Sequence, residues 1–389
     1  VVTHKYQAKK QNLIKKFEKL CETNERSVKK TYFKSVEPIG DFVRNLSSVV
    51  FSDNEMHLLN RGFKFAFQQH EQTTLENTLI SFETAIRHLE DEEKIQIRSE
   101  MLNEKENIKC QKMTNQMKDI WKTIKGLREK RDAVYFMKAD KSNNIVIMDK
   151  EEYVKMIEDF IESGPYEEVR RSPLPGMIRR TREAVKTASE TLGREIIWKL
   201  NVSNPSIPRL YTQLKLHKPG RKVRPITSNN NSPNEKLAQW LLSQFEAMPI
   251  KFETVAIKNT IEFVEKTKDL VLLEGEMQVS FDVESLYPNI PIGVTLQLLE
   301  QWLQSNQLEY EVVRELVRLT KICMDENWFR FNDKYYRQNF GCSMGSSLSP
   351  FLANLFMSHF ETTLKKEGIF PRVWLRYVDD VYAIIKNNN

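Results

Sequence analysis

The stretch RYVDDVYAII, residues 376–385, places two adjacent carboxylates, Asp379 and Asp380, between segments rich in Val, Tyr and Ile. This pattern predicts two strands joined by a tight hairpin turn. Two neighbouring negative charges repel each other unless a cation lies between them and a further ligand. Asp is also favoured in ordinary solvated turns. The choice between a plain turn and a cation site therefore depends on the rest of the chain.

A third carboxylate, Asp282, ends the segment EMQVSFD, 379 − 282 = 97 residues before Asp379. The alternation predicts a strand with Met277, Val279 and Phe281 on one face, and with Asp282 closing the polar face. If the two segments are neighbours in one sheet, the three carboxylates meet at one edge. Hard oxygen ligands suit Mg²⁺, which completes its shell with water and substrate phosphates. Two such ions, roughly 3.5–4 Å apart, activate a 3′-hydroxyl and stabilise a leaving pyrophosphate.

Charge is distributed unevenly along the 389 residues, whose net charge is +6. Residues 1–35 hold ten Lys or Arg against three Glu, and residues 201–234 hold six basic residues and no acid. Such runs are typical of a surface that binds polyphosphates, although a solvated surface would also carry them. No apolar run approaches the ~18 residues that span a membrane. The four scattered cysteines form no C-x-x-C pair, which favours a reducing compartment and argues against a zinc finger.

The sequence pattern changes near residue 131. Before it, helical periodicity and dense charge predict a helical region. After about 270, strands and helices alternate, which indicates an α/β architecture. WFRFNDKYYRQ predicts a hairpin turned at Asn332 and Asp333, and Pro350 suits the first turn of a helix that Gly368 ends.

Two loops supply further parts for nucleotidyl transfer. LKLHKPGRKVRPITS, residues 214–228, carries Lys and Arg without acids and could clamp a triphosphate. GCSMGSSLSP, residues 341–350, offers a backbone that a base pair could approach closely, or simply a loop before a capped helix.

These segments together resemble the palm of a reverse transcriptase. FDVESLYPNIP, then YRQNFGCSMGSSLSPFLANLFMSHFE, then RYVDDVYAI occur in that family's order, and Tyr-x-Asp-Asp is its hallmark. The resemblance is closest to Penelope-like retroelements, which are relatives of telomerase. Their ADKG, HKPG…RPI and KG-x-x-F segments are matched by ADKSNNIVIMDKEEY (139–153), LHKPGRKVRPITS (216–228) and LLNRGFKFA (58–66).

The resemblance implies an α/β (α+β) fold with right-hand polymerase fingers and palm, and an antiparallel palm sheet with helices on one face. We expect a helical N-terminal region at 1–130, basic at its start, fingers at 131–235 and palm at 236–389. The chain stops after the YVDD hairpin, so the thumb and the GIY-YIG endonuclease are expected to be absent, and this stretch is expected to be a partial copy, with its own activity left open. Ser142, Thr212, Gln213, Leu214 and Asn231 depart from the family pattern.

The family implies Asp282, Asp379 and the carbonyl of Val283 as metal ligands, and Asp380 as the second, less engaged catalytic carboxylate. Two Mg²⁺ ions, with Mn²⁺ as a substitute, would be the cofactors. Tyr287 would collide with a ribose 2′-hydroxyl and so select deoxynucleotides.

Nucleotide binding is implied for Arg224, with help from Lys218 or Lys215. Met344 and Gly345 would support the nascent base pair. The template and primer residues would be Ser349, Pro350 and Tyr377.

The implied function is RNA-directed DNA polymerisation by a Penelope-like retrotransposon, with an RNA template, a DNA primer and deoxynucleoside triphosphates as partners. No membrane partner is expected, the location is intracellular and nuclear, and the oligomeric state is left open. An RNA-directed RNA polymerase and a non-catalytic nucleic-acid-binding remnant are the alternatives. Tyr287 argues against the first, and the complete set of ligand residues against the second. A metal-dependent nuclease would need neither Tyr287 nor the basic segment.

Overall fold

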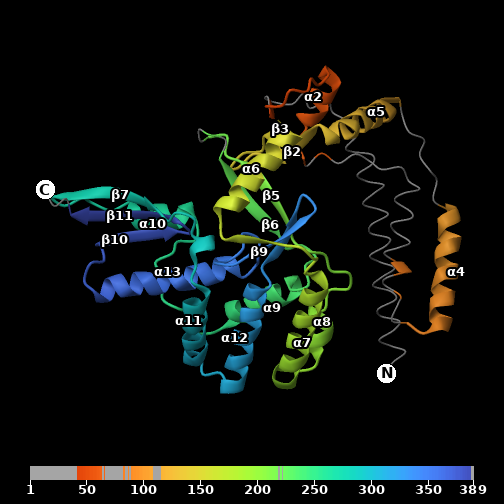
Figure 1. The fold of residues 1–389 in the computed structure, drawn as a ribbon. Coiled ribbons are helices and arrows are strands. Elements are labelled where there is room, and N and C mark those ends of the chain that lie inside the picture. Colours follow the sequence, from red (N-terminus) through yellow and green to blue (C-terminus); the bar gives the residue numbers. More distant parts are fainter. Residues whose placement is uncertain are drawn as a thin grey trace. The chain divides into compact units, whose positions relative to one another are not determined.

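The structure is a computed structural model that describes residues 42–63, 65, 82–83, 86, 89–107, 115–217, 220 and 222–386 (Figure 1). The predicted basic start of the chain and Lys218 lie outside these residues. The chain forms two compact units, Val1–Phe136 with Asn143–Asp149, and Met137–Ser142 with Lys150–Asn389. The expected boundaries at 130/131 and 235/236 stay predictions.

The first unit combines helices with a small sheet. Its described helices confirm the predicted helical character, and a buried cluster centred on Val43, Phe51, Val134, Ile145 and Ile147 forms its core. The strands have the order β1-β3-β2, with β1 parallel to β3. The elements are α2 (Asp53–Leu59), α4 (Asp91–Asn107), α5 (Asn115–Glu129), β1 (Val43–Asn45), β2 (Val134–Lys138) and β3 (Ile145–Asp149).

The second unit has a helical core that supports two sheets. Leu241, Leu299, Leu303, Leu319 and Leu352 are almost fully buried in this core, from four different helices. Leu299 and Leu303 lie four residues apart and therefore share one helix face, as the periodicity predicts. The helices are α6 (Lys150–Ser163), α7 (Leu174–Leu192), α8 (Glu195–Leu200), α9 (Glu235–Ala247), α10 (Thr260–Thr267), α11 (Ile292–Ser305), α12 (Tyr310–Asp325) and α13 (Ser349–Lys366).

One sheet of this unit has five strands in the order β4-β9-β8-β5-β6. A hairpin joins β8 to β9 and turns at Asn332 and Asp333, as predicted. Both residues have positive φ (43° and 62°), which a two-residue hairpin turn of this type requires. The strands are β4 (Tyr166–Val169), β5 (Arg209–Leu214), β6 (Val223–Ser228), β8 (Trp328–Phe331) and β9 (Lys334–Gln338).

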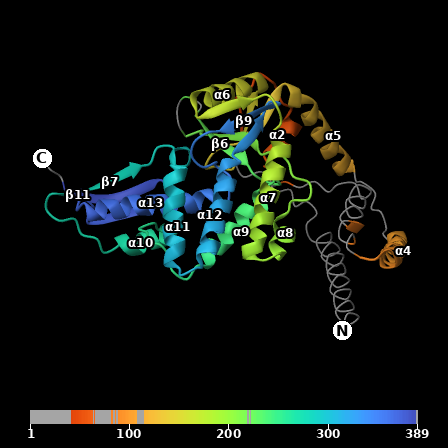
Figure 2. The same ribbon diagram turned by 60° about the horizontal axis from the view of Figure 1, so that its bottom comes forward.

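The other sheet has three strands in the order β10-β11-β7 and is antiparallel throughout, which confirms the expected palm sheet. Its strands are β7 (Glu276–Asp282), β10 (Val373–Tyr377) and β11 (Asp380–Lys386). Figures 1 and 2 show α13 running along this sheet. Val381 and Ala383 are buried on the face that also carries Arg376, whose side chain reaches α13.

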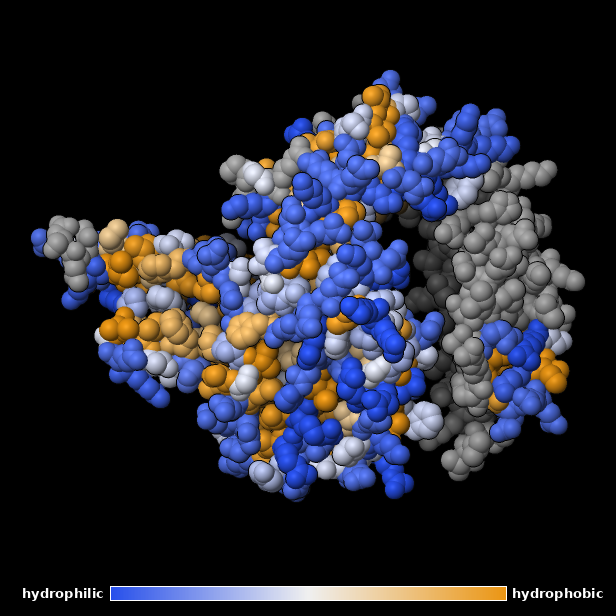
Figure 3. Space-filling model, viewed as in Figure 1, coloured by the Kyte–Doolittle hydropathy of each residue, from blue (hydrophilic) through white to orange (hydrophobic). Residues whose placement is uncertain are grey.

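The outer part of this sheet leaves apolar side chains exposed. Met277 and Phe281 of β7 are 41% and 44% exposed, and Ile369 before β10 is 63% exposed. Figure 3 shows hydrophobic side chains gathered over the region where Figure 1 draws β7, β10 and β11. The predicted apolar face of β7 is therefore real, but it is only partly covered. Among the described residues, no helix combines the length and apolar character needed to cross a bilayer.

Candidate active site

The predicted carboxylates meet at one end of the three-stranded sheet. Asp282, the last residue of β7, lies directly opposite Asp380, the first residue of β11. The next backbone contact continues this pairing, because the Val283 N–H donates to the Asp379 carbonyl at 2.9 Å. Side chains directly opposite each other on antiparallel strands have Cβ atoms about 4.5–5.5 Å apart. The strand pairing on which the predicted cation site depends is therefore present.

No positive side chain neutralises this cluster within the described part of the chain. Asp282 and Asp380 are exposed and Asp379 is half-buried, and none of the three forms an ion pair with a described Lys, Arg or His. Exposed carboxylates without a counter-charge are available to a cation. Their hard oxygens match the preference of Mg²⁺, which takes few ligands from the protein. The residues present therefore fit a divalent ion, although no described group of three His, Cys, Asp or Glu side chains is already assembled for one.

The hairpin that carries Asp379 has a strained turn. Tyr377 pairs with Asp380, so Val378 and Asp379 form the two-residue connection. Val378 has φ of 57°. A left-handed backbone costs roughly 1–2 kcal/mol for a residue with a Cβ, and β-branched residues adopt it rarely. Tyr377 is 50% exposed beside this turn, so its ring is accessible to a partner.

Tyr287 lies in a short 3₁₀ turn, η2 (Tyr287–Asn289), and packs half-buried against the helical core. Burial raises the pKa of its hydroxyl above the ordinary value, the negative charge of Asp379 adds to the rise, and Arg224 opposes it. The turn that carries Tyr287 follows β7 closely, four residues after Val283, whose N–H donates to the Asp379 carbonyl.

The glycine-rich loop, residues 341–350, contacts the turn that carries Tyr287 on one side and strand β6 on the other. Gly341 has φ of +73°, and a Cβ there would stand 2.1 Å from the Pro288 carbonyl oxygen. The neighbouring Cys342 N–H donates to the Tyr287 carbonyl at 2.8 Å. Because only glycine permits both the backbone angle and the close approach, the loop fixes the turn that carries Tyr287.

The far side of the loop is joined to β6 in the same way. Gly345 has φ of +146°, and a Cβ there would stand 1.9 Å from the Thr227 carbonyl oxygen. The Thr227 N–H donates to the Met344 carbonyl at 2.9 Å. Met344 and Gly345 therefore lie beside the strand that carries Arg224.

The helix after the loop starts at Ser349 and has Pro350 in its first turn, as predicted. Ser349 is 1% exposed, and its hydroxyl donates to the Ser343 carbonyl at 2.7 Å. Its hydroxyl is therefore used to shape the loop, and any effect of Ser349 on a template would pass through that loop.

Arg224 extends from β6 toward a buried acid. Its Nε lies 3.2 Å from Oδ1 of Asp140, which is 5% exposed, while Arg224 itself is 43% exposed. Oδ2 of Asp140 is buried with no hydrogen-bond partner among the described residues. Lys215 lies at the end of the same hairpin, where its N–H donates to the Lys222 carbonyl at 2.8 Å. The Nε edge of the Arg224 guanidinium is thus fixed, and the exposed part of the group is open to an anion.

Sequence reasoning missed two supporting residues, Asp140 and Arg376. Asp140 was noticed only as part of the ADKS segment, and its partner lies 224 − 140 = 84 residues away. Arg376 was read only as the start of the hairpin. A single charge inside an otherwise apolar strand was the signal that could have identified it, because a buried charge must be paired.

The family comparison agrees with this arrangement of motifs. Residues 216–389 match the sequence model of reverse transcriptases (RNA-dependent DNA polymerases), and this range contains the β7 strand, the glycine-rich loop and the carboxylate hairpin. No curated protein matches the chain.

Solved structures of yeast telomerases show a distant likeness. Telomerase from Candida albicans in complex with a TWJ fragment of telomeric RNA is 12% identical, with a TM-score of 0.46, over 70% of this chain and 50% of that one. Apo telomerase from Candida tropicalis, truncated from the C-terminal domain, is 12% identical, with a TM-score of 0.42, over 67% and 53%. The Candida tropicalis complex with a TWJ fragment is 11% identical, with a TM-score of 0.45, over 71% and 48%. The chain thus spans about half the length of the solved structures that it matches.

Proposed function

We propose that this reverse transcriptase domain adds deoxynucleotides to the 3′-hydroxyl of a DNA primer on an RNA template, with two divalent ions at the end of the palm sheet. The observation that carries the proposal is the pairing of Asp282 with Asp380 beside Asp379, with no counter-charge among the described residues. Magnesium bound there would polarise the reacting phosphate and lower the pKa of the attacking hydroxyl.

The chain's own residues would orient the substrates around this edge. Asp282 and Asp379, with the Val283 carbonyl, would hold the ions, and Asp380 would add negative charge to the same edge. Arg224 would bind the triphosphate, since a guanidinium makes bidentate contacts with phosphate. The pairing of Arg224 with buried Asp140 supports this role, because it fixes the guanidinium before the substrate arrives.

Tyr287 and the glycine-rich loop would form the nucleotide's sugar and base site. The Cys342 N–H donates to the Tyr287 carbonyl and Gly341 packs closely on the Pro288 backbone, so the turn that would position the ring is fixed. A fixed ring beside the sugar would exclude a 2′-hydroxyl by collision. This favours a DNA-making over an RNA-making polymerase.

The finer assignment to a Penelope-like retroelement rests on three segments. ADKS at 139–142, HKPG with RPI at 217–226 and LLNRGFKFA at 58–66 match that group's pattern in order. The ion pair between Asp140 of ADKS and Arg224 of RPI supports a joint role for the first two segments.

Primer extension by the full chain on an RNA template tests the proposal. Asp282→Asn and Asp379→Asn should each lower the Mg²⁺-dependent rate roughly 10³-fold or more, which corresponds to about 4 kcal/mol of lost transition-state stabilisation. Asp325→Asn, an exposed position at the end of α12, is the matched control and should extend primers normally. Equal extension by wild type and Asp379→Asn would remove the hairpin from the mechanism.

A further inference from the structure

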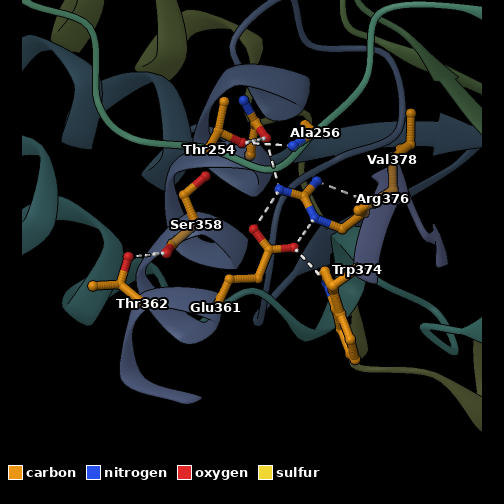
Figure 4. Close-up of polar contacts among 9 residues, drawn as sticks. Thr254, Ala256, Ser358, Glu361, Thr362, Trp374, Arg376 and Val378 are labelled. Atoms are coloured by element: carbon orange, nitrogen blue, oxygen red, sulfur yellow. Dashed lines mark hydrogen bonds and ion pairs between the residues drawn. The ribbon is translucent and has the colours of Figure 1, made fainter. Parts of the chain in front are cut away.

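A buried arginine lies directly behind the carboxylate hairpin. Arg376, on β10, is 1% exposed and is among the largest fully buried side chains in the described part of the molecule. Its guanidinium reaches α13, where Nε lies 2.5 Å from Oε1 of Glu361 and Nη2 lies 3.2 Å from Oε2 (Figure 4). Nη2 also donates to Oδ1 of Asn354 at 2.9 Å. Three of its polar contacts therefore anchor it to one helix.

The remaining nitrogen of the Arg376 guanidinium, Nη1, contacts the hairpin turn at Val378. Nη1 of Arg376 donates to the carbonyl of Val378 at 3.3 Å. This carbonyl belongs to the peptide that joins Val378 to Asp379, and Asp379 in turn accepts the Val283 N–H. A rigid guanidinium thus connects α13 to the peptide that sets the position of Asp379 opposite β7.

The network is tied down on its other sides as well. Glu361 is also buried, and it accepts from Nε1 of Trp374 at 3.3 Å. The Arg376 carbonyl accepts from the Ile257 N–H at 2.8 Å, and Thr254 Oγ1 lies 3.3 Å from Asn354 Oδ1. Figure 4 shows these groups converging between α13, the segment around Thr254 and the hairpin.

Stability alone explains this pair poorly. Two charges taken out of water cost much of what their attraction returns, and apolar side chains of similar size often stabilise a core as well. What an apolar replacement lacks is a fork that holds a specific carbonyl. Val378 needs such a hold, because its left-handed backbone persists only when the surroundings determine it.

We propose that Arg376, anchored by Glu361 and Asn354, is a positioning residue that fixes the Val378–Asp379 peptide and so holds Asp379 beside Asp282. The catalytic part of this inference rests on the function proposed above, whereas the structural part does not. Arg376 touches neither the carboxylates nor the substrate site, so it acts only through the turn.

The test separates the fork from the buried charge. Arg376→Lys keeps the charge opposite Glu361 but lacks the planar fork, and Arg376→Met with Glu361→Leu removes both charges. Arg372→Lys and Arg372→Met with Glu276→Leu are the matched controls. They alter an Arg–Glu pair, 2.6 Å apart, at the other end of the same sheet.

The first readout is hydrogen exchange of the metal-free chain. In both Arg376 variants, the amides of residues 378–381 should exchange at least about tenfold faster, while those of β7 away from Asp282 keep their protection. The Arg372 controls should leave the hairpin unchanged. Unchanged hairpin protection in a folded Arg376 double variant would overturn the proposal, as would equal loosening of the whole sheet. If the double variant does not fold, Asn354→Ala replaces it and should give the same local effect, smaller in size; intact hairpin protection there would equally overturn the proposal.

The second readout is primer extension. Displacing a reacting group slightly should lower kcat roughly 10- to 100-fold, with the KM for deoxynucleotides little changed. A folded double variant with the kcat of wild type would overturn the positioning role. If instead wild type and Asp379→Asn extend equally, the proposed function fails, and the exchange experiment still decides whether Arg376 holds the turn.

Discussion

Asp140 places a buried negative charge beside Arg224, an arginine of the basic segment at 214–228. Its main-chain N–H donates to the Leu214 carbonyl at 2.8 Å, so β5 fixes its position, and its carboxylate in turn fixes Arg224. Asp140→Asn should therefore raise the KM for deoxynucleotides roughly 3- to 10-fold and change kcat less, since a charge-assisted contact is about twice as strong as a neutral one. Steady-state primer extension measures both constants. A fall in kcat at constant KM would show that Asp140 acts elsewhere.

Tyr287 gives the clearest prediction about the substrate's sugar. Its side chain is half-buried, and under the proposed assignment its ring occupies the place of a ribose 2′-hydroxyl, which Tyr287→Val should open. We expect discrimination against ribonucleotides to fall at least about tenfold, because it is built on a steric clash. Competition between a ribonucleotide and its deoxynucleotide in single additions measures this ratio. Tyr310→Val, at an exposed position of α12, should leave it unchanged. Ready ribonucleotide incorporation by wild type would contradict the assignment.

The glycine-rich loop is an element whose sequence is dictated by its neighbours. Gly345→Ala must place a Cβ against the Thr227 carbonyl and should destabilise the chain by more than about 2 kcal/mol, or prevent folding. Gly275→Ala is the matched control. Gly275 has φ of +75° with nothing within 4 Å of a Cβ, so it reports the cost of a positive φ without any clash, about 1 kcal/mol. Urea unfolding of both variants gives the difference, and equal costs would mean that the loop can move away from β6.

The edge strand β4 should make the stability of the second unit depend on alkaline pH. The Tyr166 ring packs against Phe160 and Phe329, and this burial raises the pKa of its hydroxyl to about 12. Its neutral form is favoured in the folded chain, so its contribution is complete below pH about 10 and is lost as pH rises toward 12. At pH about 11 the loss should be about 1.4 kcal/mol. Tyr166→Phe should remove this pH dependence in urea unfolding, and Tyr310→Phe shows the effect of losing an exposed hydroxyl.

Elements were predictable where the signal is local. The turn at Asn332 and Asp333 needs two positive φ angles, which Asn and Asp tolerate, so these residue types predict the turn. The leucines of α11 repeat at helical spacing, and the alternation along β7 identifies the strand and the face that ends on Asp282. The strained Val378 was not predictable, because Val disfavours that conformation and only contacts distant in sequence hold it there.

At the scale of the molecule, the sequence did not predict which strands belong to which sheet. Alternation shows that β7 and β8 are strands, but it contains nothing about which partners they choose. The structure puts β8 in the five-stranded sheet with β5, more than 100 residues earlier, and β7 with the carboxylate hairpin. Such long-range pairings depend on how the helical core brings segments together. Resemblance to a family supplied the link between Asp282 and Asp379, and it could not supply the pair Asp140 and Arg224.

The charge of the whole chain leads to the last prediction, which separates nucleic-acid binding from catalysis. Binding of single-stranded RNA should weaken with salt, and each lost phosphate contact should reduce the slope of log K against log salt by about 0.7. Lys215→Gln with Lys222→Gln, in the acid-free segment, should reduce the slope by about 1.4. Fluorescence anisotropy with a labelled RNA, from about 50 to about 200 mM salt, measures this slope.

The control for this prediction makes the same change of net charge, from +6 to +4, at another place. Lys321→Gln with Lys334→Gln removes two lysines outside the acid-free segment, which form ion pairs with Asp325 and Glu168. If both double variants reduce the slope equally, binding follows net charge alone and the acid-free segment has no role of its own. Asp282→Asn should bind RNA at least as well as wild type, because it removes a negative charge. Loss of extension with binding intact would then place the effect of Asp282 in the chemistry.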